Sequence, residues 1–184
     1  TNSIDRSQPS ACHSRLRSAV GPRVSCMQFM SSWATEDTRT LLHFSGSSLE
    51  TFYQYIQASE FDCEAGGILL GSVHGAHLLI EHATAPTAWD KRFRYQFERM
   101  PAGHEAIAQS RWTTSQGTVR YLGEWHTHPE DHPRPSSLDR AEWSQLSALR
   151  RDKRPTLTVI VGRKALHVEL VSNSGCGQLF LPVV

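Results

Sequence analysis

The sequence lacks a hydrophobic run long enough to span a membrane. Its longest apolar stretches, such as residues 156–162, are only as long as a strand, whereas a membrane helix needs about 20 apolar residues. An excess of charge is also absent: 19 Lys and Arg against 18 Asp and Glu leave a formal net charge of +1. This balance gives no electrostatic reason to expect nucleic acid or an anionic membrane as a partner. We therefore expect a soluble protein that binds neither.

Cysteine is scarce and shows no motif. The four cysteines, at positions 12, 26, 63 and 176, form no C-x-x-C pair, which argues against a cysteine zinc ribbon and against a dense disulfide framework. A reducing compartment fits this pattern best, so we expect the protein to be cytoplasmic.

The length of 184 residues suits one domain with a hydrophobic core. Residues 1–37 are rich in Ser, Arg, Thr and Pro and lack hydrophobic periodicity, so we expect them to form a poorly ordered leader or upstream extension. Their basic, acid-poor start superficially resembles a transit peptide, and Met27 or Met30 could be the natural start. The domain is expected to cover residues 38–184.

The periodicity of residues 38–184 predicts an α+β fold, with a single mixed or antiparallel β-sheet flanked by helices. Helices are expected at residues 47–59, where Ser47 to Glu50 resemble a capping box, at 102–114, and from 136 or 137 to 151. The expected strands are residues 41–44, 66–73, 76–84, 118–128, 156–162, 165–171 and 178–183. Residues 85–101 read as irregular.

A metal site is indicated by His126-x-His128, followed after seven residues by Ser136 and after two more by Asp139. Histidines at positions i and i+2 of a strand project from the same face, so both can reach one ion. The Pro-rich loop then turns the chain, Ser136 can cap the next helix, and Asp139 lies in its first turn. Three protein ligands leave a fourth position for an activated water, which is the arrangement of a catalytic zinc ion, one per chain.

Each of these residues also has a simpler interpretation. An H-x-H pair can arise by chance among ten histidines, Ser136 can be only a helix cap, and Asp139 can merely complement the helix dipole. The combined spacing favours the metal site. A zinc nucleobase deaminase is excluded, because it requires a P-C-x-x-C downstream of its H-x-E, and the sequence has no P-C-x-x-C.

A hydrolase also needs a base that is not a metal ligand. Two glutamates qualify. Glu64 precedes a glycine-rich strand, and Glu124 shares the strand face of the two histidines. Local chemistry leaves the choice open, since Glu124 could instead orient a histidine by a hydrogen bond and Glu64 could be an ordinary exposed residue.

Together, Glu64, the H-x-H pair, Ser136 and Asp139 resemble the JAMM (MPN+/JAB) zinc metallopeptidases, over about residues 41–171. The resemblance implies a cytidine-deaminase-like fold, zinc on His126, His128 and Asp139, Glu64 as the general base, and Ser136 as a stabiliser of the oxyanion. Glu124 is then expected not to bind the zinc ion itself but to orient one of the histidine ligands by a hydrogen bond.

Longer stretches are similar to the bacterial JAB peptidases associated with CD-NTases in CBASS anti-phage operons. These are EAGGILLG at residues 64–71, TAP at 84–86 with Asp90, and YLGEWHTHP at 121–129. This resemblance implies a substrate protein with an extended C-terminal tail, a CD-NTase conjugated to a target, which the enzyme deconjugates in the bacterial cytoplasm.

The irregular stretch of residues 85–101 is the candidate for substrate contact, through Trp89, Arg92, Phe93 and Tyr95. Two alternatives stay open. One is a JAB peptidase that processes a ubiquitin-like or sulfur-carrier precursor. The other is a non-catalytic MPN scaffold, which predicts a damaged motif, whereas every motif position is present here.

Overall fold

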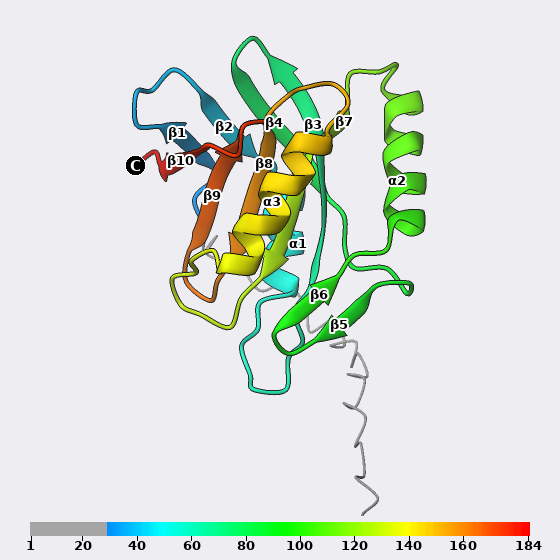
Figure 1. Ribbon diagram of the computed structural model, residues 1–184, viewed down its shortest axis with the longest axis vertical. Coiled ribbons are helices and arrows are strands. Elements are labelled where there is room, and N and C mark those ends of the chain that lie inside the picture. Colours follow the sequence, from blue (N-terminus) through cyan, green and yellow to red (C-terminus); the bar gives the residue numbers. More distant parts are fainter. Residues whose placement is uncertain (1–28) are drawn as a thin grey trace, which may run out of the picture.

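A computed structural model describes residues 29–184; most of the expected leader, with Cys12, Cys26 and Met27, lies outside these residues. In chain order the elements of the described part are β1 (Ser32–Thr35), β2 (Leu41–Phe44), α1 (Gly46–Gln54), β3 (Gly66–His74), β4 (His77–Ala83), β5 (Lys91–Phe93), β6 (Gln96–Glu98), α2 (Pro101–Thr114), β7 (Arg120–Thr127), α3 (Ser137–Leu149), β8 (Thr156–Val161), β9 (Leu166–Val171) and β10 (Gly177–Pro182) (Figure 1).

Eight strands form one mixed sheet that curls until its ends meet, in the order β1-β10-β9-β8-β7-β3-β4-β2. The pairs β2–β4 and β7–β8 are parallel, and the other pairs of the barrel are antiparallel. The turn between β3 and β4 uses Gly75 at φ +65°, a conformation that glycine adopts without strain. The predicted α+β class is confirmed, and closure of the sheet is a feature that the hydrophobic pattern did not reveal.

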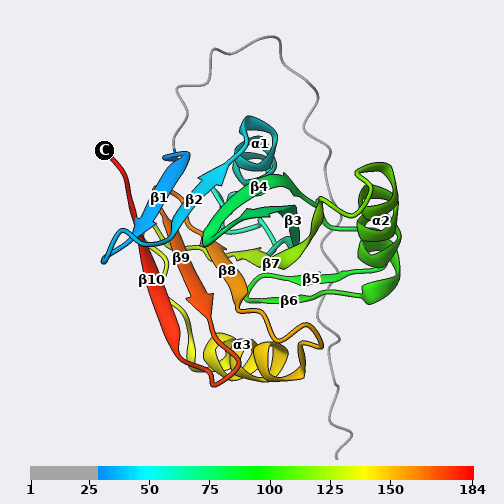
Figure 2. The same ribbon diagram turned by 90° about the horizontal axis from the view of Figure 1, so that it is seen from above.

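The main core lies on the inner side of the curved sheet. Phe44, Phe52 and Trp125 meet there, with ring centroids 5.6 Å apart for Phe44–Phe52 and 5.1 Å apart for Phe52–Trp125. Helix α1 supplies Phe52 to this core, whereas α2 and α3 lie outside the sheet (Figure 2). The strand that carries the H-x-H motif is thus packed from both faces.

The expected boundary at residue 37 is too late. Strand β1 pairs with both β10 and β2 and so closes the barrel, and Phe29 and Trp33 are 5% and 6% exposed within the core. The polar composition around this short strand concealed it.

Two other expectations need correction. Helix α1 is capped two residues earlier than expected, because Ser45 and not Ser47 is the N-cap, and it ends at Gln54 and not near residue 59. Residues 85–101 are not wholly irregular, since β5 and β6 form a hairpin. Both strands are short and polar, so the alternation that marks a half-buried strand was missing.

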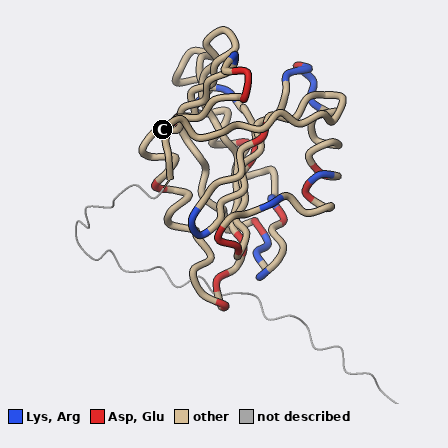
Figure 3. Tube along the Cα trace, turned by 90° about the vertical axis from the view of Figure 1, so that its left-hand side faces the viewer, with Lys and Arg blue, Asp and Glu red and all other residues tan. Residues whose placement is uncertain are grey.

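Charged residues of both signs are interspersed over the face drawn in Figure 3. None of the helices in residues 29–184 is long and apolar enough to cross a membrane.

Candidate metal and catalytic site

His126 lies at the end of β7, and His128 directly follows the last residue of this strand, where its N–H still donates to Val161 O. Backbone pairing holds this strand on both sides, with His126 opposite Gly66 of β3 and opposite Ile160 of β8. Trp125, which precedes His126, and Thr127, which lies between the two histidines, are buried. Because side chains alternate between the two faces of a strand, both imidazoles point to the opposite face. Both imidazole rings therefore lie on the same face of the sheet, as the spacing of the histidines predicts.

Asp139 reaches the same place from the first turn of α3. Ser136 caps this helix: its hydroxyl accepts a hydrogen bond from Asp139 N at 3.1 Å, and the Asp139 carboxylate accepts one from Ser136 N at 2.6 Å. This reciprocal capping box fixes the carboxylate relative to the helix start. The Ser136 hydroxyl also donates to Asp139 Oδ2 at 2.6 Å.

The ligating atoms of the three residues converge. His126 Nε2 lies 3.0 Å from His128 Nε2 and 3.1 Å from Asp139 Oδ1, and His128 Nε2 lies 3.5 Å from Asp139 Oδ2. Tetrahedral ligands bound at about 2.0 to 2.1 Å are separated from one another by about 3.3 Å. The spacing and the nitrogen and oxygen donor set therefore fit a zinc ion.

The protonation states of the site also suit a cation. Burial would raise the pKa of Asp139, but hydrogen bonds from His126 and Ser136 outweigh it and hold the pKa well below its usual range. Burial, with the neighbouring His126, lowers the pKa of His128. A carboxylate and a neutral imidazole are the forms that bind metal.

Glu64 lies directly beside the metal-binding strand. The chain at Ala65 is bonded to the segment between the histidines, since Thr127 N donates to Ala65 O at 2.8 Å. Gly66 allows this approach, because a Cβ there would lie 2.6 Å from Trp125 O. Burial raises the pKa of Glu64 to about 7, against an attractive effect of His126, and a base with a pKa near neutrality is suited to proton transfer.

Comparison with known proteins gives the family. Residues 51–172 match the family described as prokaryotic homologs of the JAB domain. The chain belongs to this family. The resemblance seen in the motif is thereby confirmed, and residues 51–172 are called the JAB domain below.

The relatives of this chain include proteins named CD-NTase/cGAS isopeptidase. The protein of Pseudomonas aeruginosa (strain BWHPSA011 / Pa011) is 76% identical over 157 residues, 85% of this chain and 99% of that protein. Those of Escherichia coli (strain TW11681) and Vibrio cholerae serotype O1 (strain ATCC 39315 / El Tor Inaba N16961) are 38% identical over 114 residues and 33% identical over 129 residues. The Escherichia coli match covers 62% of this chain and 71% of the relative. The Vibrio cholerae match covers 70% of this chain and 81% of the relative.

A solved structure supports the fold independently. The solution structure of protein DSY2949 from Desulfitobacterium hafniense superposes with a TM-score of 0.56 at 16% identity, covering 78% of this chain and 91% of that one. At this identity the likeness concerns the fold alone.

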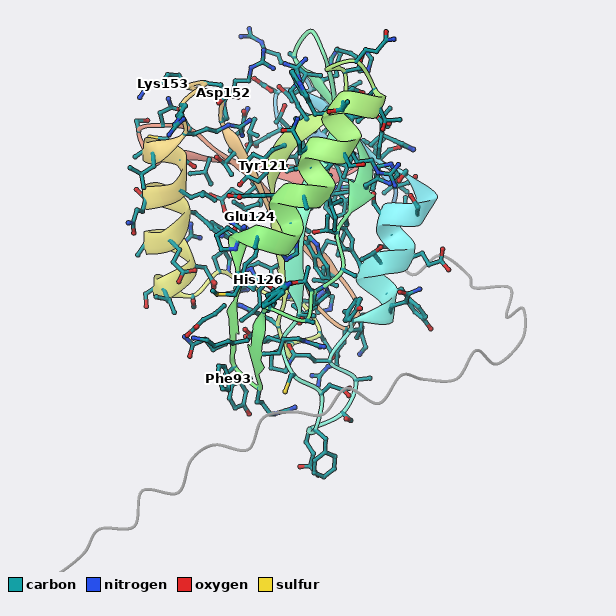
Figure 4. All side chains as sticks on the ribbon, turned by 90° about the vertical axis from the view of Figure 1, so that its right-hand side faces the viewer. Phe93, Tyr121, Glu124, His126, Asp152 and Lys153 are labelled. Carbon is teal, nitrogen blue, oxygen red and sulfur yellow. The ribbon has the colours of Figure 1, made fainter. Side chains whose placement is uncertain are left out.

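Glu124, the other glutamate considered as a base, has its own partners in the JAB domain. Its carboxylate receives hydrogen bonds from Arg99 and from the Tyr121 hydroxyl, the latter at 3.2 Å. Figure 4 shows Tyr121, Glu124 and His126 following one another along β7, between α2 and α3. Glu124 thus lies two residues before His126 on β7, and its carboxylate is held by Arg99 and Tyr121.

The four expected substrate contacts fall into two groups. Trp89 and Tyr95 are 69% and 73% exposed, as a substrate contact requires, and Phe93 lies on β5, partly buried. The Arg92 guanidinium points inward, where its Nε donates to Glu64 O at 2.8 Å.

Two polar residues next to the histidines, Thr127 and Glu130, were not predicted from the sequence. Thr127 accepts a hydrogen bond from Ala65 N at 3.0 Å, and Glu130 Oε2 lies 3.8 Å from His128 Nδ1. A carboxylate near the outer nitrogen of a ligating histidine helps to orient the ring. The sequence signal that could have indicated them is their position. Thr127 lies between the two histidines, and Glu130 lies two residues after His128.

Glu64 should destabilise the metal-free protein at high pH. The pKa of its carboxyl is about 7 in the folded chain, against an ordinary value of 4.5. As the pH rises between these values, the unfolded chain loses the proton first, so the free energy of unfolding falls over this window and stays lowered above it. We expect Glu64→Gln to raise the free energy of unfolding by about 1 to 3 kcal/mol at about pH 8, and by little at about pH 4.5.

Urea unfolding of chelator-treated protein at the two pH values measures this effect. Glu60→Gln, at an exposed glutamate of the preceding loop, is the matched control and should show no such pH dependence. Equal behaviour of the two variants would mean that Glu64 does not carry a raised pKa.

Proposed function

We propose that this JAB domain protein is a zinc-dependent isopeptidase that acts on the C-terminus of a CD-NTase conjugated to a target protein, and so reverses conjugation in bacterial anti-phage (CBASS) signalling. The observation that carries the proposal is the relative named CD-NTase/cGAS isopeptidase, which is 76% identical to this chain over 99% of its own length. The convergence of His126, His128 and Asp139 within 4.8 Å supports a metal-dependent hydrolysis.

In this proposal His126, His128 and Asp139 hold the zinc ion. When bound, the ion would supply Lewis acidity and lower the pKa of a water. Glu64 takes the proton from the attacking water and delivers it to the leaving amine, as a carboxylate near the ion that is not itself a ligand can do. Hydrolysis leaves a free C-terminal carboxylate on the CD-NTase and a free amine on the target.

Ser136 has two roles in the proposal. Its hydroxyl donates to Asp139 Oδ2 at 2.6 Å, which orients that ligand. Stabilising the oxyanion, the role implied by the resemblance, requires the hydroxyl to turn from the carboxylate toward the scissile carbonyl.

We assign two features of the JAB domain to binding of the substrate tail. Strands β5 and β6 form a sheet of their own in the described part of the chain, which offers an edge on which an extended tail pairs as an added strand. Exposed Trp89 lies shortly before β5, and exposed Tyr95 lies in the turn between β5 and β6. Beyond the ligands, a cleft of about 330 Å³ between α2 and α3 has Tyr121 and Glu124 among its lining residues and can receive further residues of the tail or the target.

A cleavage assay read by intact mass tests the proposal. Purified, zinc-loaded protein is incubated with a CD-NTase conjugated through its C-terminus and, in parallel, with a ubiquitin-like or sulfur-carrier precursor. We expect release of the CD-NTase with its C-terminus intact and no cleavage of the precursor.

Cleavage of the precursor alone would reject the CD-NTase as substrate and favour the processing peptidase. Cleavage of neither, by protein that carries zinc, would favour a scaffold that binds without catalysis.

A further inference from the structure

The β5–β6 hairpin holds the backbone of Glu64 from two directions. Glu64 N donates to Phe93 O at 2.8 Å. Arg92 Nε donates to Glu64 O at 2.8 Å, and Arg92 Nη2 donates to Cys63 O at 3.2 Å. Both peptide groups that flank the Glu64 side chain are therefore bonded to the hairpin.

The Arg92 side chain is itself held in place. Its guanidinium lies 5.4 Å from the centroid of the Tyr55 ring, in a cation–π arrangement. Two donors of a rigid planar fork reach two successive carbonyl oxygens, a geometry that a lysine ammonium cannot reproduce. Arg92 is thus suited to fix the direction of the chain at Glu64.

Gln57 forms a second link between the hairpin and the site. This residue is 1% exposed. Its Nε2 donates to Arg94 O at 2.9 Å and to Asp62 O at 3.1 Å, and its Oε1 accepts from Thr127 Oγ1 at 3.1 Å.

The Gln57 amide therefore joins the hairpin, the loop before Glu64 and the segment between the two histidines. Thr127 carries the link onward to Ala65, whose N–H its hydroxyl accepts at 3.0 Å. The two links converge on residues 62–65 from opposite sides.

We propose that Arg92 is a positioning residue for Glu64, and that Gln57 supports the same segment from the other side, so that the hairpin which receives the substrate also orients the base. The inference rests on the proposed function for the role of Glu64. Lys91 offers a contrast on the same strand, because it pairs with Glu98 across the hairpin and makes no contact with residues 62–65 among those that the structure shows.

The test compares Arg92→Ala, Arg92→Lys and the control Lys91→Ala in zinc-loaded protein. We expect Arg92→Ala to lower kcat by about 10- to 100-fold with KM and zinc content nearly unchanged, Arg92→Lys to fall between it and the wild type, and Lys91→Ala to match the wild type. Guanidinium at tens of millimolar should restore part of the kcat of Arg92→Ala and none of that of Glu64→Gln.

Backbone hydrogen exchange supplies a readout that needs no activity. The amides of Glu64 and Ala65 are expected to exchange faster in Arg92→Ala and in the milder Arg92→Lys, and at the wild-type rate in Lys91→Ala. If the wild type cleaved no conjugate, the proposed function would fail, while this measurement would still test the contact.

Unchanged exchange at Glu64 and Ala65 would overturn the inference, as would an Arg92→Ala variant that raises KM at constant kcat. The latter result would make Arg92 a substrate contact instead.

Discussion

Glu64→Gln is expected to lower kcat by about 100- to 10,000-fold, the range in which a general base contributes, while the protein keeps its zinc. Glutamine has the shape of glutamate but cannot take a proton from water. Glu64 is not among the three convergent metal ligands, so its loss should not release the ion. The measurement is kcat on a CD-NTase conjugate, with zinc per chain determined by atomic absorption on the same sample.

Glu124→Gln is the matched control, because Glu124 is the other glutamate beside the ligands and its carboxylate is bound by Arg99 and Tyr121. It should keep most of the activity. An active Glu64→Gln with an inactive Glu124→Gln would reverse the assignment of the base. Loss of zinc from Glu64→Gln would instead make Glu64 a ligand.

The convergence of the three proposed metal ligands could be predicted from sequence because most of their geometry is local. Residues two positions apart on one strand share a face, and the sequence predicts Ser136 as the cap of α3 with Asp139 in its first turn, which is where the structure places them. Only the final approach of Asp139 to His126 depends on tertiary packing.

The proximity of Glu64 to the two histidines does not follow from local sequence. It depends on the pairing of Gly66 with His126 between β3 and β7, which joins residues 60 positions apart, and no periodicity within either strand reveals such a register. For this reason the choice between Glu64 and Glu124 rested on resemblance to a family. The raised pKa of Glu64, caused chiefly by burial, is likewise visible only once the chain is folded.

The elements missed at sequence level share one cause. Strand β1 has four residues, and β5 and β6 of the hairpin have three each. Such strands are too short to show the alternation of polar and apolar residues that marks a strand. They matter nonetheless, since β1 closes the barrel and the hairpin carries Arg92. Short elements of this kind are defined by their partners across the sheet or the site and not by their own residues.

Removing a proposed metal ligand is expected to cause a large loss of zinc affinity. We expect His126→Ala and Asp139→Ala to lower zinc affinity by more than the roughly 10- to 100-fold that loss of a supporting residue costs, because two ligands remain where a catalytic site uses three. Dialysed variants should carry far less than one zinc per chain. Since binding of an ion to the folded state raises Tm, a chelator should lower the Tm of the wild type and leave that of the variants nearly unchanged.

Asp139 also serves the N-terminal cap of α3, so its loss could release zinc merely by loosening the helix. Asp139→Asn separates the two effects, because an amide oxygen can still accept the bond from Ser136 N but is a poor zinc ligand. Asp152→Ala, just beyond the opposite end of α3, controls for loss of an aspartate as such and should retain zinc. Wild-type zinc content in both Asp139 variants would exclude Asp139 as a ligand. Loss of zinc from Asp139→Ala alone would mean that the carboxylate acts through the helix cap and not on the ion.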